Sequence, residues 1–104
     1  MTDAPAPIAE IVTFRLAQGV DPDAFVAAAR ALEPLLRASG GVITRTLSQA
    51  DDGLWTDHII WRSLATAKAT AAQMMADPIA GPMMQMIDPE QVQMSHAPVL
   101  YQQE

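Results

Sequence analysis

The sequence contains no cysteine, and this absence removes several classes of function at once. Without a thiol, the chain can form no disulfide, no thiolate zinc site and no cysteine nucleophile. Positive charge is scarce as well: six Lys and Arg residues stand against twelve Asp and Glu, for a formal net charge of −6. The six cations are scattered along the chain, whereas a nucleic-acid partner requires them in clusters. We therefore expect no nucleic-acid partner.

Long hydrophobic runs are also missing. No stretch is long and apolar enough to span a membrane, and the first residues, MTDAPAP, lack the basic start and apolar run of a signal peptide. We expect no membrane partner and a cytoplasmic location. The length of 104 residues predicts a single domain over 1–104, with 1–7 as a flexible lead.

What the chain does contain is an alternation of strand and helix patterns. Period-two and short apolar runs predict strands at 8–16, 42–49, 54–62 and 92–101. Apolar residues at helical spacing predict helices at 21–39, from Ser63 to about Met75, and a short piece at 79–87. Asp21 and Ser63 should cap the first two. Pro34 should kink the first helix or end its regular part near Glu33, because proline lacks the N–H that a helix interior needs. Pro98 in the last strand indicates an edge position or a bulge.

The predicted order is βαββαβ, which gives a ferredoxin-like α+β fold: a four-stranded antiparallel sheet with both helices on one face. The strands at 8–16 and 54–62 carry apolar residues on both faces. Two helices can cover only one face, and an antiparallel sheet with a solvated second face should alternate cleanly. We therefore expect the second face to be covered by a second copy, so that two sheets form a dimeric α+β barrel.

The turn at Asp52-Gly53 decides which polar residues can meet. Asp-Gly favours a two-residue type I′ turn, and side chains alternate faces along each strand. With a two- or four-residue loop, Arg45 and His58 share one face while Asp57 lies on the other. A three-residue loop reverses this and sets Arg45 beside Asp57 as an ion pair. We expect the even register and hence a site that combines His58 and Arg45.

The candidate catalytic residues are His58, His96 and Arg45, with Trp61, Asp57, Met84 and Tyr101 as candidate substrate-binding residues. Histidine is the usual proton shuttle near neutral pH, so either histidine could act as the base. Arg45 could stabilise an oxyanion and Trp61 could stack on a flat ligand. The two histidines lie on different predicted strands without neighbouring metal-ligand spacing, so we expect no metal site.

Each of these residues also has a structural interpretation. The tryptophans Trp55 and Trp61 could simply pack in the core, and a charged pair could lie at a rim rather than perform acid–base chemistry. The methionines could be core filler or a compliant lining for an apolar ligand. For Tyr101, the only tyrosine, a packed and hydrogen-bonded role is the simpler interpretation.

Four stretches carry a family resemblance: the opening IVTFRLAQGVDPDAF, the Gly40-Gly41-Val42 start of the second strand, the hairpin ADDGLWTDHIIWRS, and the run from Asp77-Pro78 to Asp88-Pro89. Together they cover most of the chain, which resembles the dimeric α+β barrel superfamily and its antibiotic-biosynthesis-monooxygenase-like branch. The resemblance implies a homodimer and a pocket between sheet and helices. Members of the superfamily include cofactor-free oxygenases, haem-degrading enzymes, lactone isomerases and proteins of unknown role.

The sequence lacks residues that some members of that family use, and this affects which activity we expect. Its oxygenase and haem-degrading members use an asparagine near the pocket, and this sequence has none. The haem-degrading type also uses a histidine from the helical region, which is absent from 63–89. Two hypotheses follow: a cofactor-independent oxygenase or isomerase acting on a small apolar or aromatic substrate, or a non-catalytic dimer that binds a small ligand in the same pocket.

Overall fold

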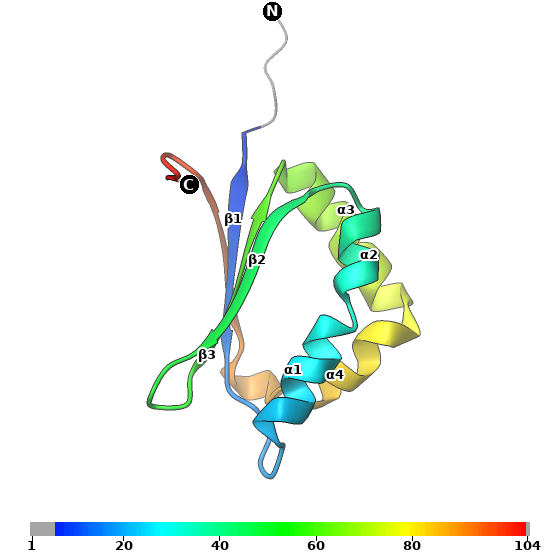
Figure 1. Ribbon diagram of the computed structural model, residues 1–104, viewed down its shortest axis with the longest axis vertical. Coiled ribbons are helices and arrows are strands. Elements are labelled where there is room, and N and C mark those ends of the chain that lie inside the picture. The colour runs from blue at the N-terminus through cyan, green and yellow to red at the C-terminus, as the bar shows by residue number, and fades with distance from the viewer. Residues whose placement is uncertain (1–5, 104) are drawn as a thin grey trace, which may run out of the picture.

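The computed structural model describes residues 6–103 and has two layers, a four-stranded sheet and a layer of helices that covers one of its faces (Figure 1). The strands are β1 (Ile8–Phe14), β2 (Val42–Gln49), β3 (Trp55–Trp61) and β4 (Gln93–Pro98). The helices are α1 (Pro22–Arg30), α2 (Glu33–Ala38), α3 (Leu64–Ala76) and α4 (Gly81–Gln85), with 3₁₀ turns η1 (Pro78–Ala80) and η2 (Pro89–Gln91). The predicted flexible lead falls mostly on residues 1–5, which lie outside the described residues.

The sheet is antiparallel throughout and its strand order is β2-β3-β1-β4. The predicted ferredoxin-like fold is therefore confirmed. β4 lies at an edge of the sheet, and Pro98 ends that strand, in the edge setting that its missing N–H requires. Across residues 6–103, no helix is long and apolar enough to cross a membrane.

The predicted helix over 21–39 is broken into two. Asp21 caps α1 by accepting a hydrogen bond from the Asp23 amide, and α1 ends at Arg30. Pro34 has no N–H to donate to the carbonyl of Arg30, and it lies in the first turn of α2, where that donor is not needed. The interruption predicted for Pro34 is thus confirmed, although the first helix ends three residues before the predicted position near Glu33.

Between β3 and β4, the helix α3 and the turns η1 and η2 each begin at a residue whose side chain caps the first turn. Ser63 accepts a hydrogen bond from the Thr66 amide at the start of α3, as its side chain predicted. Asp77 and Asp88 cap η1 and η2 in the same way, each followed directly by a proline. The first Asp-Pro step separates α3 from α4, and the second precedes β4.

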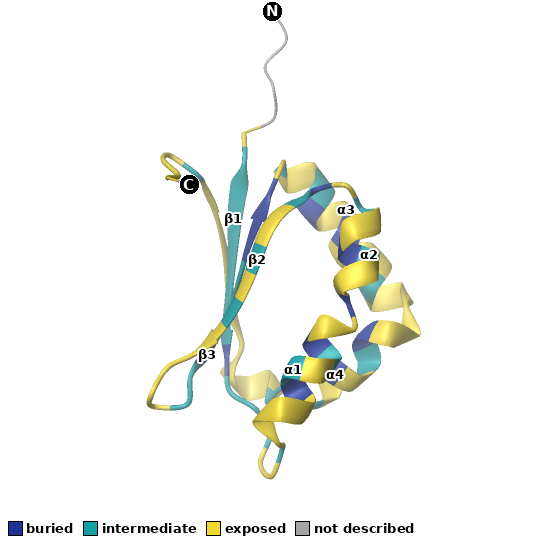
Figure 2. Ribbon diagram, viewed as in Figure 1, coloured by how far each residue is buried: buried dark blue, intermediate teal, exposed yellow. Residues whose placement is uncertain are grey.

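The core contains an aromatic cluster at one end of the sheet. Phe14, Phe25 and Trp55 have ring centroids 5.0–6.3 Å apart. At these separations aromatic pairs add to the burial of apolar area. Figure 2 shows that the buried residues lie between the two layers, whereas the outer faces of the helices are exposed. The cluster joins α1 to β1 and β3, and Phe14 and Phe25 also border the cavity described below.

The hairpin between β2 and β3 differs from the prediction. The Ala50 amide donates to the Leu54 carbonyl (2.9 Å), so the loop is the three residues Asp51–Gly53. Only Gly53 has a positive φ (+90°), which rules out a type I′ turn, because that turn needs two such residues. The loop is stabilised instead by the Leu54 amide bonded to the Asp52 carboxylate and by Arg15, which donates to the Asp52 carbonyl at 2.8 Å.

The predicted even register is therefore wrong. Arg45 lies opposite Ile59, and Leu47 lies opposite Asp57. A shift of one residue moves every side chain to the other face, so Arg45 now shares a face with Asp57 rather than with His58. The preference of Asp-Gly for a two-residue turn is overridden by the contacts that the side chains of Asp52 and Arg15 make with the loop.

Gly41 marks the closest approach between β2 and α3, and it provides a test of the packing. A Cβ at this position would lie 2.0 Å from Thr66 Cγ2, and Thr66 is held by a hydrogen bond between its hydroxyl and that of Ser63. Gly41→Ala should therefore destabilise the protein by about 1–3 kcal/mol in urea unfolding. Adding Thr66→Ser, which removes Cγ2, should recover much of the loss.

Gly81 is the matched control for this substitution, because a Cβ there would meet no atom within 4 Å and its φ is −55°. Gly81→Ala should stabilise the protein by about 0.4–1 kcal/mol, because alanine lowers the conformational entropy of the unfolded chain. Equal effects of the two substitutions would contradict a specific clash at Gly41.

Candidate functional site

A cavity of about 920 Å³ lies between the sheet and the helices. The side chains of Val12 and Ile59 form part of its floor on the sheet, and methionines of α3 and α4 form part of its roof. Most of its surface is apolar, with a few polar side chains among them. Ligand sites of small molecules have this size and this composition.

The polar side chains are placed by one row of paired residues that crosses the whole sheet. Glu10 pairs with His96 on β4 and with Ile59 on β3, and Ile59 in turn pairs with Arg45 on β2. Paired side chains lie on the same face, here the face toward the helices. With strands about 4.8 Å apart, His96 and Arg45 stand roughly 14 Å from each other at the two sides of the cavity.

Arg45 is fully engaged in this wall. Its Nε and one terminal nitrogen donate to the two oxygens of Asp57 at 3.1 and 2.8 Å, and its other terminal nitrogen donates to the Ala29 carbonyl at 2.9 Å. Both side chains are mostly buried, with 17% and 14% of their surface exposed. A bidentate pair of this kind fixes geometry as well as charge. Arg45 therefore ties β2, β3 and α1 together.

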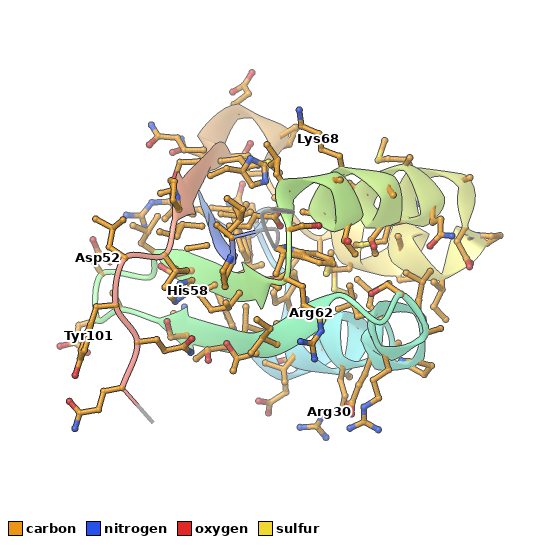
Figure 3. The ribbon with its side chains drawn as sticks, turned by 90° about the horizontal axis from the view of Figure 1, so that it is seen from above. Arg30, Asp52, His58, Arg62, Lys68 and Tyr101 are labelled. Carbon is orange, nitrogen blue, oxygen red and sulfur yellow. The ribbon has the colours of Figure 1, made fainter. Side chains whose placement is uncertain are left out.

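This arrangement corrects the predicted site. His58 lies at an alternate position from Asp57 and Ile59, so it points to the face of the sheet away from the helices and does not line the cavity (Figure 3). The predicted combination of His58 with Arg45 is wrong, because the three-residue hairpin loop reverses the parity on which it depended. Arg45, whose nitrogens are already bonded, is a wall residue and not a free donor for an oxyanion.

The second polar pair joins β1 and β4. His96 Nε2 lies 3.0 Å from Glu10 Oε1, and the side chains keep 30% and 12% of their surface exposed. An ionised carboxylate can only accept, so Nε2 is the donor in this hydrogen bond, and Nδ1 is the ring nitrogen left to accept a proton when the imidazole is neutral. A carboxylate that orients an imidazole in this way is the arrangement used for general bases. Glu10 was not among the predicted site residues; its parity with the cavity-facing Val12 and Phe14 was the signal that could have identified it.

The remaining predicted residues fall into two groups. Trp61, Asp57 and Met84 line the cavity, and Trp61 is 2% exposed with its Nε1 lacking a hydrogen-bond partner. Tyr101 is 80% exposed beyond the end of β4 and does not line the cavity (Figure 3). The structure thus brings most of the predicted binding residues together and leaves Tyr101 outside.

One side of the cavity is open. Met75 of α3 and Met94 of β4 line it while exposing 79% and 59% of their surface, and Lys68 of α3 also belongs to the lining. The side chain of Lys68 lies on the β4 side of α3 (Figure 3). These residues form the mouth of the cavity, between α3 and β4.

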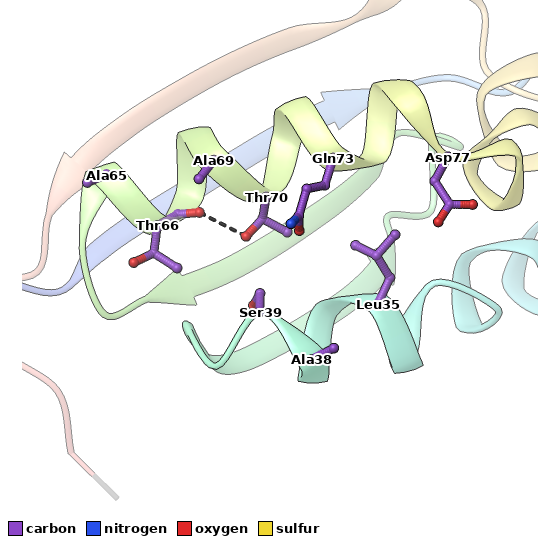
Figure 4. Close-up of a pocket in the computed structure, with 9 residues that line it drawn as sticks. All are labelled: Leu35, Ala38, Ser39, Ala65, Thr66, Ala69, Thr70, Gln73 and Asp77. Atoms are coloured by element: carbon purple, nitrogen blue, oxygen red, sulfur yellow. Dashed lines mark hydrogen bonds between the residues drawn. The ribbon is translucent and has the colours of Figure 1, made fainter.

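A second hollow, of about 690 Å³, lies between α2 and α3 (Figure 4). It is lined largely by small residues, and its hydroxyls are bonded within the chain: Thr70 donates to the Thr66 carbonyl at 2.8 Å and Ser39 to the Leu36 carbonyl at 2.6 Å. We regard it as a packing groove. Within residues 6–103, no group of three or more His, Cys, Asp or Glu side chains is arranged to hold a metal ion.

Comparison with solved structures relates this architecture to known proteins. SnoaB, a cofactor-independent oxygenase from Streptomyces nogalater, is 14% identical with a TM-score of 0.68, over 95% of this chain and 96% of SnoaB. A protein from Bordetella bronchiseptica, named as a candidate antibiotic biosynthesis monooxygenase, is 17% identical with a TM-score of 0.75, over 92% of this chain and 99% of its own. The chain has the antibiotic-biosynthesis-monooxygenase-like fold.

The same fold also occurs in NE2512, a protein of unknown function from Nitrosomonas europaea, with 14% identity, a TM-score of 0.67 and coverage of 98% and 97%. No family model and no curated protein matches the sequence. Identities this low show a shared antibiotic-biosynthesis-monooxygenase-like fold and leave the activity to be argued from the cavity.

The wall pair can be tested by a double-mutant cycle. Asp57→Leu should destabilise the protein by about 3 kcal/mol, because it leaves the buried charge of Arg45 uncompensated. Arg45→Met should act similarly, and the double variant should lose clearly less than the sum, measured by urea unfolding. Strictly additive losses would show that the two residues do not stabilise the fold as a pair.

Proposed function

We propose that this protein is a cofactor-independent enzyme of the oxygenase kind, which removes a proton from a small apolar substrate that is enolisable or phenolic. The observation that carries the proposal is the Glu10–His96 pair, which opens onto a cavity of about 920 Å³ with mainly apolar walls. On the opposite wall, the charges of Arg45 and Asp57 balance each other in an ion pair. His96 is thus the cavity histidine with a carboxylate to orient it.

The chemistry requires little from the protein beyond this base. His96 Nδ1 takes a proton from an activated C–H or O–H, and the resulting carbanion or phenolate passes one electron to O₂. The two radicals combine to a peroxide, which the protonated His96 neutralises, and loss of water leaves a ketone. For an anthrone the balance is one substrate plus one O₂ to one quinone plus one H₂O. The role of Glu10 is to hold the imidazole and to stabilise its charged form.

The apolar walls favour the anion's reactivity and set the substrate class. Methionines Met74, Met83 and Met84 can adapt to a flat ring system, because thioether chains repack readily. Trp61 supplies an aromatic wall on the sheet side. Isomerisation of a lactone would use the same base without consuming oxygen, and a non-catalytic binding protein would use the same cavity without turnover.

Substitution of the base tests the proposal. His96→Gln should lower oxygen uptake with anthrone or quinol substrates by about 10²–10⁴-fold, the range for loss of a general base. Glu10→Gln should cause a smaller loss, because it weakens the orientation of the ring and leaves the base in place. Oxygen consumption followed with an electrode is the measurement.

His58→Gln is the matched variant, since it makes the same change on the other face of the sheet. It should retain activity. Equal losses in both histidine variants would contradict the role of His96, and an absence of turnover with anthrone, quinol and lactone substrates alike would favour the binding protein instead.

We also propose a homodimer formed by the uncovered faces of two sheets. The helices cover one face only (Figure 1), and the positions that point to the other face are uncharged apart from His58. Ile11 and Ile60 lie on it among small and hydroxyl-bearing residues. A solvated sheet face normally carries charged residues, so this composition favours burial against a second copy.

Light scattering tests the dimer. The wild-type protein should have twice the 11.2 kDa mass of the chain at micromolar concentration. Ile11→Lys, which places a charge at the centre of the uncovered face, should give a monomer, whereas Ile79→Lys adds the same charge on η1 and should leave the dimer intact. A monomeric wild-type protein would rule the dimer out.

A further inference from the structure

The mouth of the cavity carries a positively charged side chain, Lys68, that forms no ion pair with the residues of the cavity wall. Four charged or titratable groups on the sheet side of the cavity form two pairs, Glu10 with His96 and Arg45 with Asp57. Lys68 lines the same cavity from α3, and no ion pair or hydrogen bond engages its ammonium among residues 6–103. In a chain with a net charge of −6, an unpaired cation at this place is notable.

The helix geometry aims Lys68 at the cavity side of α3. Ala71 and Met75, three and seven residues later, also line the cavity, and residues at these spacings share one face of a helix. The lysine therefore stands at the exposed edge of that face, beside the open side marked by Met75 and Met94. Its long stem can follow a ligand while its charge stays in water.

We infer that the ligand of this cavity is an apolar ring compound that bears a carboxylate, with the carboxylate at Lys68 in the mouth and the rings under the methionines. This inference rests on the proposed function, since it concerns the same cavity. It specifies the substrate class further: an acid whose charged end stays at the solvent and whose opposite end reaches toward the base.

A carboxylate fits this site better than a phosphate. Phosphate recognition uses a guanidinium fork or several convergent N–H groups, and the cavity's only arginine has both ends of its guanidinium bonded already, to Asp57 and to the Ala29 carbonyl. A single ammonium at an exposed position matches one negative charge. The acidic net charge of the chain also disfavours a dianion.

The test compares two ligands of the same shape, 2-naphthoic acid and its neutral amide, 2-naphthamide, by titration calorimetry of the full chain. The wild-type protein should bind the acid about two- to fivefold more tightly than the amide, the range for an ion pair at a solvent-exposed site. Raising the ionic strength should reduce this preference. Lys68→Met, which keeps an apolar stem, should abolish it and leave amide binding unchanged, and Lys68→Arg should preserve it.

Arg30→Met is the matched control, because it removes one positive charge from the exposed end of α1, away from the cavity lining (Figure 3). It should leave the preference intact. Equal affinity of the wild-type protein for acid and amide would overturn the inference, as would an equal weakening of both ligands by Lys68→Met, which would indicate packing alone. Loss of the preference in Arg30→Met would also overturn it, since the effect would then come from net charge.

The two proposals fail separately. If the acid is preferred and Lys68 is responsible, but no substrate consumes oxygen, the inference stands and the proposed catalysis fails. If oxygen uptake depends on His96 but acid and amide bind equally, the catalysis stands and the inference fails. If neither naphthalene ligand binds up to its solubility, the inference is overturned whatever the activity.

Discussion

The bidentate pair between Arg45 and Asp57 is the interaction on which the arrangement of the cavity depends. It crosses from β2 to β3 and reaches α1 through the Ala29 carbonyl, so it joins three elements at one side of the interlayer space. Two charges in so apolar a place are tolerated because each is satisfied by the other and by further hydrogen bonds. The pair forms only in the register of the three-residue hairpin loop, because that register puts Arg45 and Asp57 on the same face of the sheet.

The two ends of the same row of paired residues have different roles, one in stability and one at the ligand site. At the β2 side, Arg45 has all its nitrogens bonded and stabilises the wall. At the β4 side, His96 is bonded through one nitrogen only and belongs to an edge strand whose residues are exposed. An edge strand has fewer packing contacts than a central one, so side chains on it remain accessible to a ligand. The β2 side of the cavity, in contrast, contributes to the stability of the fold.

The cavity itself follows from an uneven distribution of large side chains. Phe14, Phe25 and Trp55 fill one end of the space between sheet and helices. Trp61 is buried at the other end of β3, and between these aromatic residues α3 presents alanines, such as Ala67 and Ala71, to the cavity.

The sequence by itself determined the element order, the capped helix starts at Asp21 and Ser63, the break at Pro34 and the fold, and it limited the strand of Pro98 to an edge position or a bulge. Each of these depends on local chemistry: a missing N–H, a capping carboxylate or hydroxyl, or the period of apolar residues. Only the tertiary structure decided the hairpin register, because the choice between two and three loop residues rested on contacts of Arg15 and Asp52 that are 37 residues apart. That choice placed Arg45 on the same face as Asp57 and not with His58, whereas the pairing of β1 with β3 and β4 placed Glu10 and His96 at the cavity, since a strand shows its side chains alternately to its two faces.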